Sequence, residues 1–170
     1  MDKDWYGTPV PWEVSWVAAC SPEELLFGAV VEAPARCEEG AGFREGLWTH
    51  DVLELFVPCL RTTLHAARGE PRYLELNLAP SGAWWACLFE GYRIRCPRQP
   101  FPCEVRVWST RREGSWSAAL ALPLAPIGIS LDLPRLRFCA ILGEPRRYLI
   151  HGISPGGTPD FHRQVLSTTE

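Results

Sequence analysis

A two-residue alternation of apolar and polar side chains is the dominant pattern of this chain, and it recurs in nine short segments. Successive side chains of a β-strand point to opposite faces of a sheet, so this period predicts strands with one buried face. Proline, glycine and serine separate the segments and are typical of turns. The predicted strands are Trp12–Ala18, Leu25–Glu32, Asp51–Val57, Arg72–Leu78, Ala83–Glu90, Cys103–Ser109, Ser115–Leu122, Arg137–Gly143 and Arg147–Ile150.

Nine short strands and 16 prolines favour an all-β fold, an antiparallel β-sandwich, over a parallel sheet with crossover helices. A chain of 170 residues predicts a single domain, residues 1–170, that buries roughly 70% of its unfolded surface. A loop near the candidate site is predicted at Ala33–Gly46, and helical turns at Arg61–Ala67 and Pro123–Gly128. The expected core residues are Leu53, Leu55, Leu74, Leu76, Val105, Val107 and Leu120.

Composition excludes several classes of partner. A net charge of −3 and a pI of about 5.8 argue against a nucleic-acid surface, which needs clustered positive charge. No apolar run approaches the roughly 20 residues that a membrane helix needs, and the polar start lacks the apolar stretch of a signal peptide. Seven cysteines without a C-x-x-C pair predict reduced thiols. The expected location is therefore cytoplasmic.

Two of the predicted strands carry carboxylates where neutral residues are usual. Glu54 lies between Val52 and Phe56, on the face opposite Leu53 and Leu55. Similarly, Tyr73, Glu75 and Asn77 share one face of the segment Arg72–Leu78, opposite a leucine face. A charged group flanked by aromatic residues on a sheet face predicts a site for a polar ligand.

The pairing of the next strand decides which tryptophan joins these carboxylates. If Ala79–Gly82 is a hairpin loop, Asn77 lies opposite Trp84, and Trp84 shares the face of Glu75. A slip of one residue would bring Trp85 to that face instead, because neighbouring side chains alternate. Both registers remain open from the sequence.

A family resemblance begins at these residues. Trp48, Asp51, Glu54 and Phe56 resemble the W-x-x-D-x-x-E-x-F signature of the family 9 carbohydrate-binding modules and the wider DOMON-like group. Later elements resemble bacterial DOMON-like proteins in particular: Tyr-x-Glu-x-Asn, Ser-Gly-x-Trp, Tyr-Arg and Pro159-Asp160-Phe161-His162. The similarity spans about Pro11 to Arg163. The resemblance implies a β-sandwich that binds sugars or haem. For a sugar, it implies that Trp48 stacks on the ring and Glu54 binds hydroxyls.

Sugar recognition needs an aromatic plate together with carboxylate, amide or guanidinium groups that meet the hydroxyls. The family closes its site with a second, distant tryptophan, which this chain lacks in the corresponding stretch; Tyr148 or His151 is expected to replace it. The candidate ligand-binding residues are Trp48, Asp51, Glu54, Glu75, Asn77, Trp84, Arg93, Tyr148 and His151.

Haem and metals are not expected as cofactors. The single methionine is Met1, the four histidines are isolated, and His162 is expected to bond locally in a loop. No cluster has zinc-ligand spacing.

Two further functions remain as alternatives to a non-catalytic sugar-binding module. Glu54 and Glu75 could form the carboxylate pair of a glycosidase, although nothing in the sequence selects catalysis over binding. The other alternative is a protein-interaction or structural domain that has lost its ligand site. An open pocket at Glu54 beside an exposed tryptophan would favour a ligand; a site filled with aromatic side chains would favour the structural role.

Overall fold

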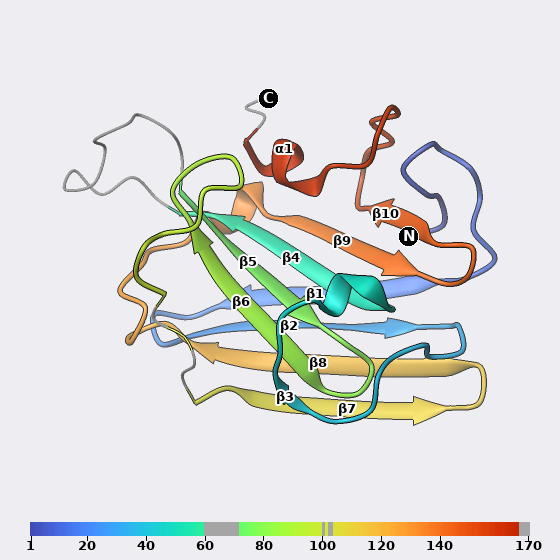
Figure 1. The fold of residues 1–170 in the computed structure, drawn as a ribbon, viewed down its shortest axis with the longest axis horizontal. Coiled ribbons are helices and arrows are strands. Elements are labelled where there is room, and N and C mark those ends of the chain that lie inside the picture. Colours follow the sequence, from blue (N-terminus) through green and yellow to red (C-terminus); the bar gives the residue numbers. More distant parts are fainter. Residues whose placement is uncertain (60–71, 100, 102–103, 167–170) are drawn as a thin grey trace.

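Two β-sheets pack face to face in the computed structural model, which describes residues 1–59, 72–99, 101 and 104–166 (Figure 1). The four-stranded sheet has the order β1-β2-β8-β7 and the six-stranded sheet the order β10-β9-β4-β5-β6-β3. The predicted all-β sandwich is therefore confirmed. The strands are β1 (Val14–Cys20), β2 (Glu24–Val31), β3 (Gly42–Phe43), β4 (Val52–Pro58), β5 (Tyr73–Leu78), β6 (Ala83–Phe89), β7 (Arg106–Arg112), β8 (Ser115–Pro123), β9 (Arg137–Leu142) and β10 (Arg147–Ile150).

All nine predicted strands are present with shifted ends, and the described residues add four short elements that alternation did not reveal. β3 lies inside the predicted loop Ala33–Gly46 and pairs in parallel with β6. The 3-10 helix η1 (Leu47–Thr49) and the helix α1 (Phe161–Leu166) are too short to show a helical period. A further 3-10 helix, η2, spans Leu133–Arg135.

The two predicted helical turns have different outcomes. Pro123–Gly128 begins with the last residue of β8 and continues as a hydrogen-bonded turn, in which the N–H groups of Ile127 and Gly128 donate to the carbonyl of Leu124, both at 3.0 Å. The prediction at Arg61–Ala67 lies outside the described residues, as does the predicted strand start at Cys103.

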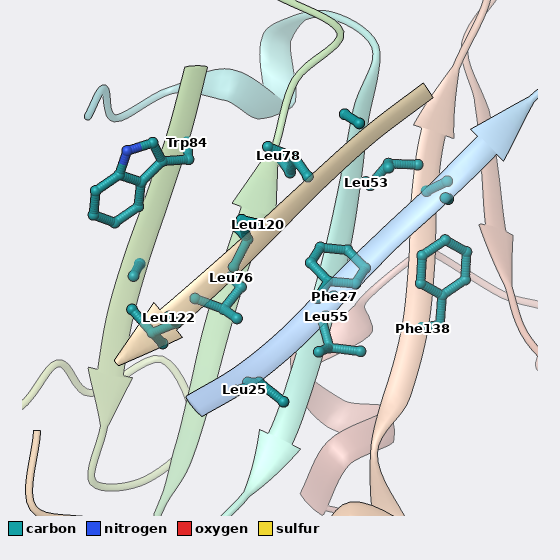
Figure 2. Close-up of a cluster of buried hydrophobic side chains, with 14 of the residues drawn as sticks. Leu25, Phe27, Leu53, Leu55, Leu76, Leu78, Trp84, Leu120, Leu122 and Phe138 are labelled. Atoms are coloured by element: carbon teal, nitrogen blue, oxygen red, sulfur yellow. The ribbon is translucent and has the colours of Figure 1, made fainter. Parts of the chain in front are cut away.

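The main core lies between the two sheets and is built by the apolar faces that alternation predicts. Burying one such leucine or phenylalanine side chain stabilises the fold by about 1.5–3 kcal/mol. Of the expected core residues, Val105 and Val107 are half-buried against the cluster, and the five leucines are fully buried. Figure 2 shows both sheets contributing, with labelled side chains that include Leu25, Phe27, Leu53, Leu55, Leu76, Leu120 and Phe138.

A second apolar cluster covers the opposite face of the six-stranded sheet. α1 packs against β4 and β9 on this face, and Trp5 of the N-terminal segment contacts Phe161 of α1 with ring centroids 5.6 Å apart. The central strands β4, β5 and β6 are therefore buried on both faces. Any polar side chain on the outer face of these strands lies in surroundings that are largely apolar.

Candidate functional site

The register of β4, β5 and β6 sets the composition of this outer face. Glu54 pairs across the strands with Asn77, and Asn77 pairs with Trp85. In the adjacent row, Phe56 pairs with Glu75. Side chains in one row of neighbouring strands point to the same face, so Trp85 shares the face of the two glutamates.

The predicted pairing of Asn77 with Trp84 is wrong by one residue. The N–H of Ala79 donates to the carbonyl of Ala83 at 2.8 Å, so only residues 80–82 form the hairpin loop. Gly82 closes this loop with a φ of 80°, the left-handed conformation that three-residue hairpins require. Trp84 consequently points into the core between the sheets, where its ring meets Phe43 edge-on at 4.9 Å.

An open pocket of about 310 Å³ lies over this outer face. Ligand pockets in proteins range from about 300 to 1,000 Å³, so it is large enough for a small ligand. Trp48, carried by η1, forms one wall; its side chain is 39% exposed and meets Trp85 edge-to-face at 5.9 Å. The other lining residues are Glu54, Phe56, Glu75, Phe89, Arg93, Arg95, Ile141, Tyr148, Pro159, Asp160, Phe161 and His162.

Two carboxyl groups lie in the pocket with little contact to water. Glu54 is 4% exposed and Glu75 is 5% exposed. Burial raises the pKa of Glu54 well above its ordinary value; the charge of Glu75 adds to this effect, while Arg146 and Arg93 oppose it. Burial also raises the pKa of Glu75 to about 7, against the opposing hydrogen bond from Asn77. Both groups therefore keep their protons to a higher pH than an ordinary carboxyl group, because a charge is costly in apolar surroundings.

Hydrogen-bond acceptors in this part of the sheet outnumber the donors around them. The Asn77 amide donates to Oε1 of Glu75 at 3.1 Å, but Oε2 of Glu75 and Oδ1 of Asn77 accept no hydrogen bond from the described residues. Within the same residues, no side chain donates to Glu54 at hydrogen-bond distance. Buried polar groups without partners are rare in native proteins, so a ligand that supplies donors would complete the site.

Tyr73 and His162 form a polar bridge on one side of the pocket. The Tyr73 hydroxyl lies 2.6 Å from Nδ1 of His162 and accepts a 3.3 Å hydrogen bond from the backbone N–H of Arg93. Burial lowers the pKa of His162 to about 4, so the ring is neutral at pH 7. The hydroxyl then donates to Nδ1, which places the imidazole proton on Nε2, 3.6 Å from Oε2 of Glu75.

The rim of the pocket is cationic, but its cations have anionic partners. Arg93 pairs with Asp160 at 3.2 Å, and Tyr92 also donates to Asp160, at 2.5 Å. Arg95 pairs with Glu45 and lies 5.3 Å from the ring centroid of Trp85. Arg93 has a φ of 55°, a left-handed conformation that is uncommon outside glycine and often marks functional sites.

Five of the nine predicted ligand-binding residues line the pocket: Trp48, Glu54, Glu75, Arg93 and Tyr148. They come from η1, β4, β5, β10 and the turn after β6, which places chemically different groups around one cavity. Of the two residues expected to replace the second tryptophan, Tyr148 lines the pocket and His151 does not. The open pocket beside exposed Trp48 is the arrangement that favours a ligand over an aromatic-filled, purely structural site.

The other four predicted residues lie away from the pocket lining. Asp51 is 3% exposed and accepts backbone hydrogen bonds from Arg36 at 2.9 Å and Gly143 at 2.8 Å, so it joins two loops. Asn77 is fully buried behind the glutamates, and Trp84 lies in the core. His151 is exposed and packs edge-on against Trp16 of β1, with ring centroids 5.0 Å apart.

The structure adds pocket residues that the sequence reasoning did not select. Trp85, which the alternative register would bring to this face, lines the pocket. Tyr73 shares the face of Glu75 by simple alternation and contacts the lining residue His162. His162 does not bond locally in a loop as expected, since its partner Tyr73 is 89 residues away. The segment Pro159-Asp160-Phe161-His162, identified only by resemblance, supplies four of the lining residues.

Neither a metal centre nor a membrane helix is found in the described part of the chain. Residues 1–59, 72–99, 101 and 104–166 contain no group of three or more His, Cys, Asp or Glu side chains arranged to hold a metal ion. Helices within these residues are too short and too polar to cross a membrane. The pocket over the outer face of the six-stranded sheet is therefore the candidate site.

Comparison with known proteins supports the fold. No protein-family model matches the chain, and no curated protein matches it. Among solved structures, the chain is similar to a protein from Bacteroides uniformis to which a carbohydrate-binding role has been provisionally assigned. The two share 18% sequence identity with a TM-score of 0.66, over 97% of this chain and 79% of the other. At this identity the likeness shows a common fold.

Proposed function

We propose that the chain is a non-catalytic binding module of the DOMON-like, family 9 type, and that its pocket binds a mono- or oligosaccharide. The observation that carries the proposal is the position of an exposed tryptophan, Trp48, beside two buried carboxyl groups: within the described residues, Glu54 receives no side-chain donor and Oε2 of Glu75 accepts no hydrogen bond. A sugar offers an apolar C–H face to the indole and hydroxyl donors to the carboxyl oxygens.

The pocket dimensions and walls agree with a small ligand. Trp48 and Tyr148 supply aromatic surface, and Arg93 supplies guanidinium donors near the opening. The structural neighbour with a provisional carbohydrate-binding role adds support, although it shares only the fold.

The state of the two carboxyl groups favours binding over glycoside hydrolysis. A glycosidase needs one protonated carboxyl as the acid and one ionised carboxylate, and therefore environments that push the two pKa values apart. Here burial raises the pKa of both Glu54 and Glu75. We expect no release of nitrophenol from nitrophenyl glycosides above the rate without protein.

We extend the proposal to a reducing, cytoplasmic location. The six cysteines among the described residues are all unpaired, which agrees with a compartment that keeps thiols reduced.

Calorimetric titration with a panel of mono- and disaccharides tests the sugar proposal, and two tryptophan variants show where the sugar binds. Trp48→Ala should weaken binding at least about tenfold, the effect of losing roughly 1.4 kcal/mol of stacking. Trp108→Ala is the matched control, because Trp108 is also exposed, at 52%, but lies on β7 of the other sheet. Loss of binding in the control alone, or no binding by wild type at millimolar concentrations, would refute the proposal.

A further inference from the structure

We propose that the sugar bound in this pocket carries a protonated amine beside its hydroxyls, as an amino sugar does, and that Glu54 and Glu75 receive the ammonium group. This inference rests on the proposed function and narrows its ligand class. It follows from the balance of charge and hydrogen-bond donors around the two carboxyl groups.

The two carboxyl groups have an unmet demand for hydrogen-bond donors. Glu75 keeps Oε2 without a hydrogen-bond partner, and Glu54 receives no donor from the described side chains. Both groups point into the pocket from neighbouring strands. An ammonium group carries three donors and a full charge, whereas a hydroxyl carries one donor and no charge. One ammonium can therefore satisfy both carboxylates together.

The arginine side chains near the two carboxyl groups already have other partners. Arg93 pairs with Asp160 at 3.2 Å and Arg95 pairs with Glu45. Arg146 donates to the backbone carbonyls of Trp48 and His50. His162, the group closest to Glu75, is neutral at pH 7 because burial lowers its pKa. None of these cations forms a salt bridge to Glu54 or Glu75 within the described residues.

Aromatic side chains form part of the pocket walls. Trp48 presents an exposed indole to the pocket, and the half-buried Tyr148 also lines it. The faces of such rings attract cations, and the attraction grows as the cation leaves water. Arg95 already lies over Trp85 in this manner, at 5.3 Å from the ring centroid. The exposed ring of Trp48 remains available for the ligand.

Proton release distinguishes an ammonium ligand from a neutral sugar. The other titratable groups near the carboxyl pair are Tyr73, Cys87 and Cys139, whose pKa values are raised by burial, so they stay neutral at pH 7. The charged groups around it are Glu45, Asp160, Arg93, Arg95, Arg146 and Arg163. An arriving cation would ionise Glu75 and Glu54 and drive protons into the buffer. A neutral sugar would not drive this release.

The test is calorimetric titration of the full chain at pH 7 with glucosamine, glucose and N-acetylglucosamine, whose rings differ at one substituent. Glucosamine should bind at least about tenfold tighter than the other two, the scale of one charge-assisted hydrogen bond. Its apparent heat should change with the ionisation heat of the buffer, which reports proton release. Glu54→Gln and Glu75→Gln should each remove most of the preference, while weaker glucose binding persists.

Each result decides one of the two proposals. Equal or tighter binding of glucose or N-acetylglucosamine would overturn the amine inference and leave the sugar function standing. Failure of all three sugars and of the wider panel would instead refute the sugar function. A glucosamine preference that survives in both glutamine variants would place the amine elsewhere and overturn the assignment. If a variant fails to fold, the comparison of the three sugars on wild type still tests whether the pocket prefers the amine.

Discussion

Glu54 on β4 and Glu75 on β5 enter one pocket from neighbouring strands, and the charge of Glu75 helps to raise the pKa of Glu54. Both side chains are almost completely buried. The ionised pair is therefore costly in these surroundings, and the folded protein holds protons that the unfolded chain would release. This arrangement has consequences for stability as well as for binding.

The first prediction concerns stability against pH. A carboxyl group whose pKa is raised by folding contributes its full stabilisation of the folded state below its unfolded pKa, 4.5. This contribution to the unfolding free energy is lost as the pH rises. For Glu75 the loss runs through a pKa of about 7, and for Glu54 it continues higher. Wild type should therefore lose stability relative to Glu75→Gln by up to about 1.4 kcal/mol per pH unit within this window.

Urea unfolding of wild type and Glu75→Gln between pH 4.5 and 8.5 measures that difference. His162 acts in the opposite direction: burial lowers its pKa from 6.5 to about 4, so its contribution is lost as the pH falls through that range. Comparing the two proteins cancels the part of this effect that the variant leaves unchanged. Parallel stability curves across the window would contradict the assignment of Glu75.

The second prediction concerns the hydroxyl of Tyr73. Tyr73→Phe keeps the ring, which stacks on Phe89 at 4.8 Å, but removes the partner of His162 Nδ1 and of the Arg93 N–H. The unfolding free energy should fall by about 1–3 kcal/mol, the cost of leaving buried polar groups unpaired. Tyr6→Phe, at a tyrosine that is 60% exposed, should change it by less than about 0.5 kcal/mol. Equal effects in urea unfolding would argue against the bridge.

The third prediction separates the two tryptophans that the sequence assigned to the site. Trp84→Ala should destabilise the protein by about 3–5 kcal/mol, because it leaves a cavity in the core between the sheets. Trp48→Ala should cost about 1 kcal/mol or less, because its ring is 39% exposed, and should act on binding instead. Thermal melts rank the two variants, and the opposite ranking would contradict the observed hairpin register.

The fourth prediction concerns Asp51. Asp51→Ala removes the acceptor of two backbone N–H groups, those of Arg36 and Gly143, and should lower the unfolding free energy by about 2–4 kcal/mol. Asp2→Ala, at an exposed position, serves as the control and should cost less than about 0.5 kcal/mol. If urea unfolding finds Asp51→Ala as stable as wild type, the structural role of Asp51 is contradicted.

Alternation was sufficient to predict the sheet faces, because the two-residue period assigns each side chain in a strand to one face. It placed Leu53 and Leu55 in the core and Glu54 on the other face, as the structure has them. Alternation did not determine the hairpin register, because loops of three and four residues fit the same sequence. The hydrogen bonds around Ala79 decide that question in the structure.

The remaining parts of the site depend on contacts between distant segments. His162 meets Tyr73 across 89 residues of sequence, and Asp51 joins loops that carry Arg36 and Gly143. Such contacts leave no periodic signal, so an acidic residue next to a strand looks the same whether it binds a ligand or fixes a loop. Only the three-dimensional arrangement separates Asp51 from Glu54.

The most direct measurement of the central claim follows the indole N–H signals of the eight tryptophans by NMR while sugar is added. Each signal is assigned by a Trp→Phe variant. The account predicts that the signals of Trp48 and Trp85 shift in a saturable manner, while those of Trp108 and Trp116 stay in place. Unmoved signals at Trp48 and Trp85 under saturating sugar, or shifts confined to Trp108, would contradict it.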